Sequence, residues 1–317
     1  MRILVTGANG FIGSALCRHL MQANYAVRAM VRRQAEAPLL ATEHQLINQI
    51  DGATDWYSHL RGVDVVIHLA ARAHVLKEES ANPLMEFRRT NTEGTINLAQ
   101  QAQQNSVRRF IYLSSIGVNG NHTLDKSFDE NDVPNPQEDY ALSKWEAEQA
   151  LNEMSRDSKM EVVILRPPLV YGPQCKGNFL RLLRLAQLSI PLPLASVINL
   201  RSLIYIENLL DVLLLCINHA NASGKTYLVS DNETISTPQL LFLLGNALGH
   251  QVKLFPLPLP VLLALGKITG KYNEIAKLTY SLTVNSTKIR DELNWQPRFT
   301  LQQGLQATAS WYKSNAK

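Results

Sequence analysis

The first thirteen residues constrain the fold of this chain more than any other segment. An apolar run, Ile3–Thr6, leads directly into a turn with glycines at 7, 10 and 13, and a helical pattern, Gly13–Ala23, follows. Gly7 permits a tight turn, Gly10 leaves no side chain between the backbone and a phosphate, and Gly13 lets the helix pack on the strand. Free N–H groups and the helix dipole at such a turn favour phosphate charge. The segment therefore predicts a dinucleotide-binding α/β fold, in a variant of the G-x-G-x-x-G spacing.

The rest of the first half repeats this alternation of strand and helix. Further strand-like runs are Ala26–Val31, Gln45–Ile50, Val63–Leu69, Arg109–Ser114 and Glu161–Arg166, and helical patterns between them include Asn91–Gln104 and Tyr140–Ser155. Buried strands that alternate with helices predict a parallel sheet with helices on both faces. Such sheets bind ligands beyond the carboxyl ends of their strands.

The pattern changes after residue 172, where prolines become frequent. Asn208–Asn218 and Pro238–Leu248 look helical, and Tyr227–Ser230 looks like another strand of the main sheet. We expect α/β architecture in two parts: a Rossmann-type doubly wound parallel sheet in residues 1–172, and a smaller mixed α/β substrate lobe in residues 173–317, with some segments returning to the sheet. The apolar stretch Val252–Leu265 is shorter than the ~20 residues of a membrane span. It contains three prolines, so we expect an extended arm and a short buried helix.

Composition narrows the class of protein. A formal net charge of +4 over 317 residues, without a dense Lys/Arg run, gives no case for nucleic acid. The three cysteines, Cys17, Cys175 and Cys216, are far apart, which argues against a disulfide framework and a zinc site and indicates a cytoplasmic protein with three core thiols. The strand-like run that begins at residue 2 predicts no signal peptide.

The end of the second strand bears on the cofactor. A dinucleotide without a 2′-phosphate usually meets an Asp or Glu there, whereas this chain has Arg32 and Arg33 and no acid. A guanidinium at this point suits a 2′-phosphate, and two solvated surface residues are the alternative. The sequence therefore favours NADP(H), with NAD(H) as the other choice.

Tyr140 and Lys144 are four residues apart and would share one face of a helix, which Asp139 is placed to cap. A phenol has a pKa of about 10, and a nearby ammonium would lower that pKa toward the range useful for proton transfer. The spacing is common by chance. Ser115 gives it weight, because this residue follows a strand where a parallel sheet presents its active residues, and its hydroxyl could bind an oxygen that alternates between alcohol and ketone. A strand-end cap is the alternative reading of Ser115.

The chain resembles an extended short-chain dehydrogenase/reductase of the NAD-dependent epimerase/dehydratase family. The resemblance covers nearly the whole chain and is carried by Thr6–Gly13, His68–Ala71, Asn91–Thr95, Leu113–Ser115, Tyr140–Lys144, Arg166-Pro167, Tyr171–Pro173, Arg201–Tyr205 and Leu293–Pro297.

The resemblance implies a role for individual residues. The catalytic residues would be Ser115, Tyr140 and Lys144. The cofactor would be held by Gly7, Asn9, Gly10, Phe11, Ile12, Gly13, Arg32, Arg33, Gln49, Ile50, Leu69, Ala70, Ala71, Asn91, Tyr140, Lys144 and Pro167. The substrate would be held by Ser115, Asn178 and Arg201, with Arg201 on the nucleotide diphosphate. No metal is implied. Many relatives dimerise through the helices equivalent to Thr92–Gln104 and Tyr140–Ser155, so a homodimer is expected.

Some family features are missing from this sequence. Gln49-Ile50 replaces an Asp-apolar pair that holds the adenine in many epimerases. Pro168–Tyr171 lacks an Asn that contacts the sugar, and Thr279–Val284 lacks a second Arg for the diphosphate. The contacts that hold the substrate are therefore expected to differ in detail from those of the epimerases that have these residues.

The resemblance implies hydride transfer at C4 of a UDP-sugar in surface polysaccharide biosynthesis, with neither nucleic acid nor membrane insertion. Two versions remain open. Arg32 favours a 4-ketoreductase that uses NADPH to reduce a UDP-4-keto-6-deoxy-HexNAc; the alternative is a UDP-glucose or UDP-GlcNAc 4-epimerase with tightly bound NAD. A 4,6-dehydratase fits less well, because Ile116–Asn119 carries no carboxylate. A non-catalytic NADP-sensing regulator is an alternative of a different class, although such proteins usually lose the Tyr or the Lys.

Overall fold

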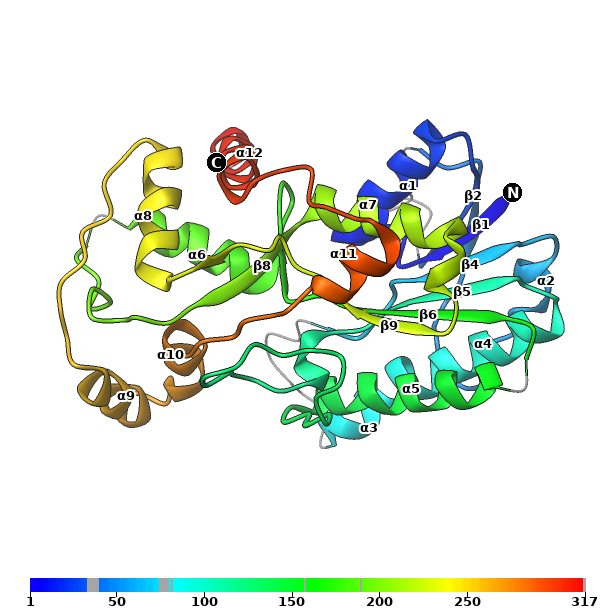
Figure 1. Ribbon diagram of the computed structural model, residues 1–317, viewed down its shortest axis with the longest axis horizontal. Helices are drawn as coiled ribbons and strands as arrows, with labels where there is room; N and C mark the ends of the chain where they lie inside the picture. The colour runs from blue at the N-terminus through cyan, green and yellow to red at the C-terminus, as the bar shows by residue number, and fades with distance from the viewer. Residues whose placement is uncertain (33–39, 74–79, 81, 157, 189, 316–317) are drawn as a thin grey trace.

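The main body of the molecule is a seven-stranded parallel sheet, in the order β3-β2-β1-β4-β5-β6-β9 (Figure 1). The computed structural model describes residues 1–32, 40–73, 80, 82–156, 158–188 and 190–315. A second sheet has the order β10-β8-β7 and is mixed, because β8 runs parallel to β7 and antiparallel to β10.

The strands and helices have the following bounds. The strands are β1 Arg2–Thr6, β2 Ala26–Val31, β3 Glu43–Leu46, β4 Val65–His68, β5 Arg109–Leu113, β6 Glu161–Arg166, β7 Leu169–Tyr171, β8 Arg201–Tyr205, β9 Lys225–Leu228 and β10 Thr234–Ile235. The helices are α1 Phe11–Gln22, α2 Tyr57–Leu60, α3 Pro83–Phe87, α4 Gly94–Gln104, α5 Asp139–Arg156, α6 Gly177–Gln187, α7 Ile206–Asn218, α8 Thr237–Leu248, α9 Leu259–Ile268, α10 Tyr272–Thr279, α11 Thr287–Leu293 and α12 Leu301–Asn315. A π-helical segment, Arg88–Glu93, joins α3 to α4.

The alternation of side chains along β1 builds a core on each face of the main sheet. Ile3 and Val5 belong to one buried cluster, whereas Leu4 belongs to another, because successive strand residues point to opposite faces. Helices α1 and α7 cover the first face, and α4 and α5 cover the second (Figure 1). The doubly wound α/β fold expected from the sequence is confirmed.

The two parts of the chain exchange strands. Strand β9 lies after residue 172 and completes the main sheet beside β6. A segment from the second part of the chain therefore returns to the main sheet. Strand β7 lies before residue 172 and pairs with β8 in the small sheet. The division of the chain at residue 172 stays a prediction.

Two sequence expectations differ from the structure. The third strand was expected at Gln45–Ile50 but forms at Glu43–Leu46, because Ile50 packs on the start of α4, where a Cβ on Gly94 would lie 2.8 Å from Ile50 Cγ2. The apolar helix expected to be buried after Pro258 is α9, and it is largely exposed, since Ile268 is 81% exposed. Among the described residues, no helix is long and apolar enough to cross a bilayer. All three thiols are buried.

Candidate active site

The glycine turn between β1 and α1 has the shape of a phosphate cradle. Gly7 has φ +65°, and a Cβ there would lie 2.9 Å from the amide nitrogen of Ala70. A Cβ on Gly13 would lie 2.1 Å from the carbonyl oxygen of Gly7. The N-cap residue Gly10 supplies no side-chain acceptor to the first turn of α1, which begins at Phe11. Amides at a helix start that lack such an acceptor are available to an anion, so the turn fits a dinucleotide pyrophosphate.

A buried network fixes the loop after β4 beside this turn. Thr6 Oγ1 accepts hydrogen bonds from the amides of Leu69 (3.2 Å) and Ala70 (3.1 Å). His68 joins Thr6 Oγ1 through Nδ1 (2.7 Å) and Thr95 Oγ1 through Nε2 (2.9 Å). Burial lowers the pKa of His68 to about 3, so the ring is neutral at ordinary pH and acts as a structural link. Sequence reasoning did not identify this network, although Thr6 at a strand end was a usable signal.

Ser115 and Lys144 lie at the carboxyl end of β5, and Tyr140 lies one turn before Lys144 on α5. The Lys144 Nζ donates to the carbonyl oxygen of Leu113 (2.9 Å) and lies 4.5 Å from the centre of the Tyr112 ring. Ser115 follows β5 and accepts a hydrogen bond from the amide of Gly117 (3.1 Å), so it also caps a short 3₁₀ turn. A Cβ on Gly117 would lie 3.2 Å from Ala141 Cβ, which shows that α5 begins close to this turn.

Burial sets the proton affinity of the two titratable groups. Burial lowers the pKa of Lys144 to about 7, against the opposing effect of the Glu148 carboxylate. Burial raises the pKa of Tyr140 to about 12. The expected lowering of the tyrosine pKa is therefore wrong, because desolvation of the phenolate outweighs any effect of the lysine. Tyr140 carries its proton at neutral pH.

A buried ion pair joins α5 to the ends of β5 and β6. The Arg166 guanidinium binds both carboxylate oxygens of Glu148, with Nε–Oε1 at 3.0 Å and Nη2–Oε2 at 2.5 Å, and its Nη1 donates to Asn119 Oδ1 (2.9 Å). The Ser114 hydroxyl donates to the same carboxylate. Glu148 is fully buried. Sequence reasoning missed this cluster; the position of Glu148 four residues after Lys144, on the same helix face, was the signal.

Asn91 lies in the π-helical segment and links α5 to the loop after β4. Its amide group exchanges hydrogen bonds with the backbone of Arg72 (2.8 and 3.1 Å) and donates to Ser143 Oγ (3.0 Å). Pro167 lies on the other side of the site, where its carbonyl accepts from the amide of Ile116 (3.0 Å). Both residues expected near the cofactor therefore lie against the elements that carry Ser115 and Lys144.

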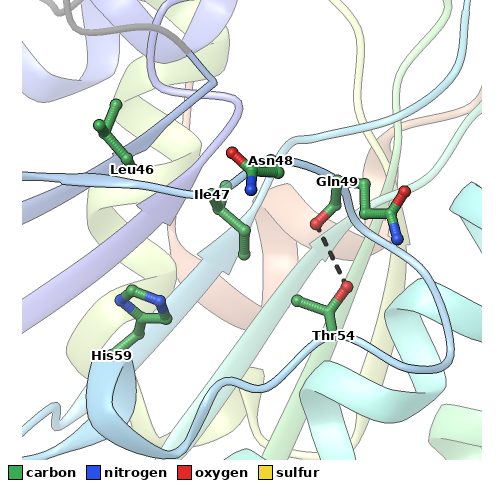
Figure 2. A pocket seen from close by; sticks show the side chains of 6 residues that line it. All are labelled: Leu46, Ile47, Asn48, Gln49, Thr54 and His59. Carbon is green, nitrogen blue, oxygen red and sulfur yellow. Dashed lines mark hydrogen bonds between the residues drawn. The ribbon is translucent and has the colours of Figure 1, made fainter.

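The residues expected at the adenosine end lie at the ends of β2 and β3. Arg32 is exposed directly after β2, and Arg33 lies outside the described residues. Gln49 follows β3, and its carbonyl accepts from Thr54 Oγ1 (3.2 Å). The side chain of Gln49 points away from Thr54 (Figure 2). It lines a cavity of about 500 Å³ with Leu46, Ile47, Asn48, Thr54 and His59.

The two residues expected on the substrate lie on separate elements of the smaller lobe. Arg201 begins β8, and its Nη1 donates to the carbonyls of Lys277 (2.6 Å) and Tyr280 (3.3 Å). Burial lowers the pKa of this guanidinium. Asn178 is exposed in the first turn of α6. In the described part of the chain, no hydrogen bond joins either residue to Tyr140, and no group of three or more metal-binding side chains occurs.

Comparison with known proteins identifies relatives along the whole chain. Residues 3–230 match the NAD dependent epimerase/dehydratase family. A UDP-glucose 4-epimerase of Vibrio cholerae is 41% identical over 312 residues, which cover 97% of this chain and 94% of that protein. The solved UDP-glucose 4-epimerase of Thermotoga maritima with UDP-glucose has a TM-score of 0.79 at 20% identity and 100% coverage of both chains. The UDP-glucuronic acid 4-epimerase of Bacillus cereus in complex with NAD has a TM-score of 0.79 at 22% identity, also with 100% coverage of both. The two structures support the fold.

Proposed function

The chain belongs to the NAD-dependent epimerase/dehydratase family, and from this premise we propose that it is a nucleotide-sugar 4-epimerase that keeps NAD bound and inverts C4 of a UDP-hexose. The arrangement of Tyr140 and Lys144 on α5, against the end of β5, is the observation that carries the proposal. The 41% identity to a protein named as a UDP-glucose 4-epimerase supports the epimerase over the reductase that the sequence pattern favoured.

In this proposal the chain handles the proton of the C4 hydroxyl. The bound dinucleotide supplies the acceptor and donor for the C4 hydride. Tyr140 takes the proton from the C4 oxygen as the hydride leaves and returns it when the hydride comes back to the opposite face, so no oxidant or reductant is consumed. Ser115 donates a hydrogen bond to the same oxygen in its ketone state. Lys144 supplies a positive charge beside the phenol when it is protonated.

The pKa of Tyr140 sets a condition on this chemistry. A phenol held at about 12 is a poor base at neutral pH. Positive charge in the cleft favours the phenolate; an oxidised nicotinamide would supply such charge, and so would Lys144 in its protonated form. Oxidation of the sugar is therefore proposed to begin only in the loaded enzyme.

A second candidate is the NADPH-dependent 4-ketoreductase. The exposed Arg32 at the end of β2, with no acid in β2 itself, is the observation that favours it, because a guanidinium suits a 2′-phosphate. The two candidates differ in the nucleotide that they retain and in whether they consume it.

The deciding experiment identifies the nucleotide released from the denatured purified protein by mass spectrometry. Interconversion of UDP-glucose and UDP-galactose, and of the N-acetylated pair, is then followed by NMR without added cofactor. We expect NAD and turnover, and we expect Tyr140→Phe to retain NAD but lose about 100-fold or more in rate. Stoichiometric oxidation of NADPH as a UDP-4-keto-6-deoxy-HexNAc is reduced, without interconversion of the UDP-sugars, would contradict the epimerase and support the reductase.

We also propose that the protein is a cytoplasmic homodimer. The three free, buried thiols suit a reducing compartment. The homodimer is proposed on the family resemblance. Ala99, Ala102 and Ala147 on α4 and α5 pack into the core under the sheet, so they give no separate support for a partner subunit. Light scattering of the purified chain tests the oligomeric state.

A further inference from the structure

Helix α9 carries an apolar face that the rest of the lobe leaves uncovered. Val261 and Leu265 are each 46% exposed, Ile268 is 81% exposed, and Ala264 is exposed between them. These four residues, here called the α9 face, have the i, i+3, i+4, i+7 spacing of one helix face. An apolar stripe of this kind differs from the single exposed hydrophobic residues that are normal on a protein surface.

The opposite side of α9 is already packed. Leu262 and Gly266 are its buried residues, and a Cβ on Gly266 would lie 2.9 Å from Ile275 Cδ1 and 3.2 Å from Tyr272 Cα of α10. The α9 face is therefore not the side that joins the helix to the lobe. Because α9 is apolar on both sides and a helix apolar all round is normally buried, the α9 face is expected to be covered by something outside this chain.

Lysines outnumber carboxylates on and beside α9, where Glu274 in the first turn of α10 is the nearest acid in the sequence. No Asp or Glu occurs from Thr234 to Asn273, whereas Lys253, Lys267 and Lys271 fall in this range and are all exposed. Lys267 lies within α9 and Lys271 directly precedes α10. Lysines beside an apolar stripe are typical of helices that lie on anionic lipid. A two-fold dimer through the α9 face would instead bring the lysines of both copies into one interface, where like charges repel.

The position of α9 suits a planar surface. The helix lies at the end of the molecule away from the main sheet (Figure 1). It has 10 residues and is about 15 Å long, whereas the hydrocarbon core of a bilayer is about 30 Å thick. The helix can therefore lie in the headgroup layer but is too short to cross the bilayer. The arm that leads into α9 adds Phe255, which is 42% exposed.

We propose that α9 docks this protein on an anionic phospholipid surface, with the α9 face in the acyl boundary and Lys267 and Lys271 on the headgroup phosphates. This inference does not depend on the proposed function. It concerns a surface contact and differs from insertion across the bilayer.

The test is flotation of the purified full-length protein with vesicles of phosphatidylcholine, with and without phosphatidylglycerol. We expect binding to the mixed vesicles that weakens as salt is raised. The double variant Leu265→Ser/Ile268→Ser should bind about tenfold more weakly, because it removes apolar area from the lipid contact. Lys267→Gln/Lys271→Gln should lose the preference for phosphatidylglycerol.

The matched control is Phe242→Ser, which removes an apolar side chain that is 53% exposed on α8 and should leave vesicle binding unchanged. Thermal unfolding of each variant checks that the fold is kept. Absence of binding to the mixed vesicles, or equal loss in the control, would overturn the proposal. Self-association of the unaltered protein that Leu265→Ser/Ile268→Ser abolishes would also overturn it, in favour of a second copy as the occupant.

Discussion

Two residues of the candidate site, Lys144 and Glu148, illustrate what burial does to charge. Lys144 loses water without gaining a carboxylate in hydrogen-bond contact, and the pKa of its ammonium falls to about 7. Glu148 loses water as well but binds Arg166 through both oxygens. The four-residue spacing of Tyr140 and Lys144 is local, so it could be predicted from the sequence. The partner of Glu148 lies 18 residues away on a strand, and only the fold brings the two together.

Lys144→Met should change the pH dependence of stability. The folded pKa of Lys144 is about 7, below its ordinary value of 10.5. The unfolded chain therefore binds more protons than the folded chain between these two pH values. As a result, the lysine lowers the free energy of unfolding most at and below about pH 7. We expect the variant to gain stability relative to the unaltered protein near pH 7, and the difference to shrink toward about pH 10. Urea unfolding across this range measures it. A difference that does not vary with pH would mean that the buried ammonium has an ordinary pKa.

Glu148→Gln should destabilise the protein strongly, because it leaves the Arg166 guanidinium buried without its counter-charge. Breaking a buried pair from one side costs roughly 3–5 kcal/mol, and the side chains of Arg166 and Glu148 are 5% and 0% exposed. Chemical unfolding measures the loss. Lys126→Met removes the ion pairs of an exposed lysine with Asp129 and Asp132 and serves as the control, with no measurable change expected. Equal effects of the two variants would contradict the assigned role of the buried pair.

At the scale of elements, the β1–turn–α1 unit could be predicted because its constraints are local. The turn needs a positive φ at Gly7, and the glycine spacing records that need. The position of β3 could not be read in the same way. It is an edge strand with alternately half-buried and exposed residues, and the apolar residues that suggested a longer strand pack elsewhere, as Ile50 does on α4.

Gly7→Ala and Gly224→Ala form a matched pair that separates backbone strain from close approach. Both glycines have positive φ, +65° and +69°, but a Cβ on Gly7 would lie 2.9 Å from Ala70 N, whereas one on Gly224 would meet nothing within 4 Å. We expect each variant to lose about 1 kcal/mol from strain, and only Gly7→Ala to lose the copurifying dinucleotide. Retention of the dinucleotide by Gly7→Ala would contradict the cradle inferred at this turn.

At the scale of the molecule, the two lobes are interleaved. Helix α7 lies after residue 172 yet packs against α1 on one face of the main sheet (Figure 1). Strand β9 completes that sheet beside β6. The same lobe carries α9 at the far end of the molecule (Figure 1). Helix α10 packs on α9, and the carbonyl of Lys277 in α10 accepts a hydrogen bond from Arg201. Helix α10 therefore links the proposed lipid contact to the residue expected on the diphosphate.

A fragment of residues 1–172 should not fold on its own. It lacks α7, which buries eight residues including Leu209, Leu210 and Leu213; at about 2 kcal/mol for each large apolar side chain, their loss approaches the whole stability of a domain. We expect the fragment to be largely unfolded by circular dichroism and the full chain to unfold in one transition. A folded fragment that binds the dinucleotide would show that the lobes are independent.

The sequence by itself determined the α/β class, the phosphate-binding turn and the spacing of Tyr140 and Lys144, because each depends on residues close together in the chain. The tertiary structure decided what depends on distant residues. It decided that burial raises the pKa of Tyr140 to about 12, that Glu148 pairs with Arg166, and that α9 presents an apolar face outward. The physical reason is that desolvation and packing follow from the neighbours that the fold supplies, and a local pattern does not contain them.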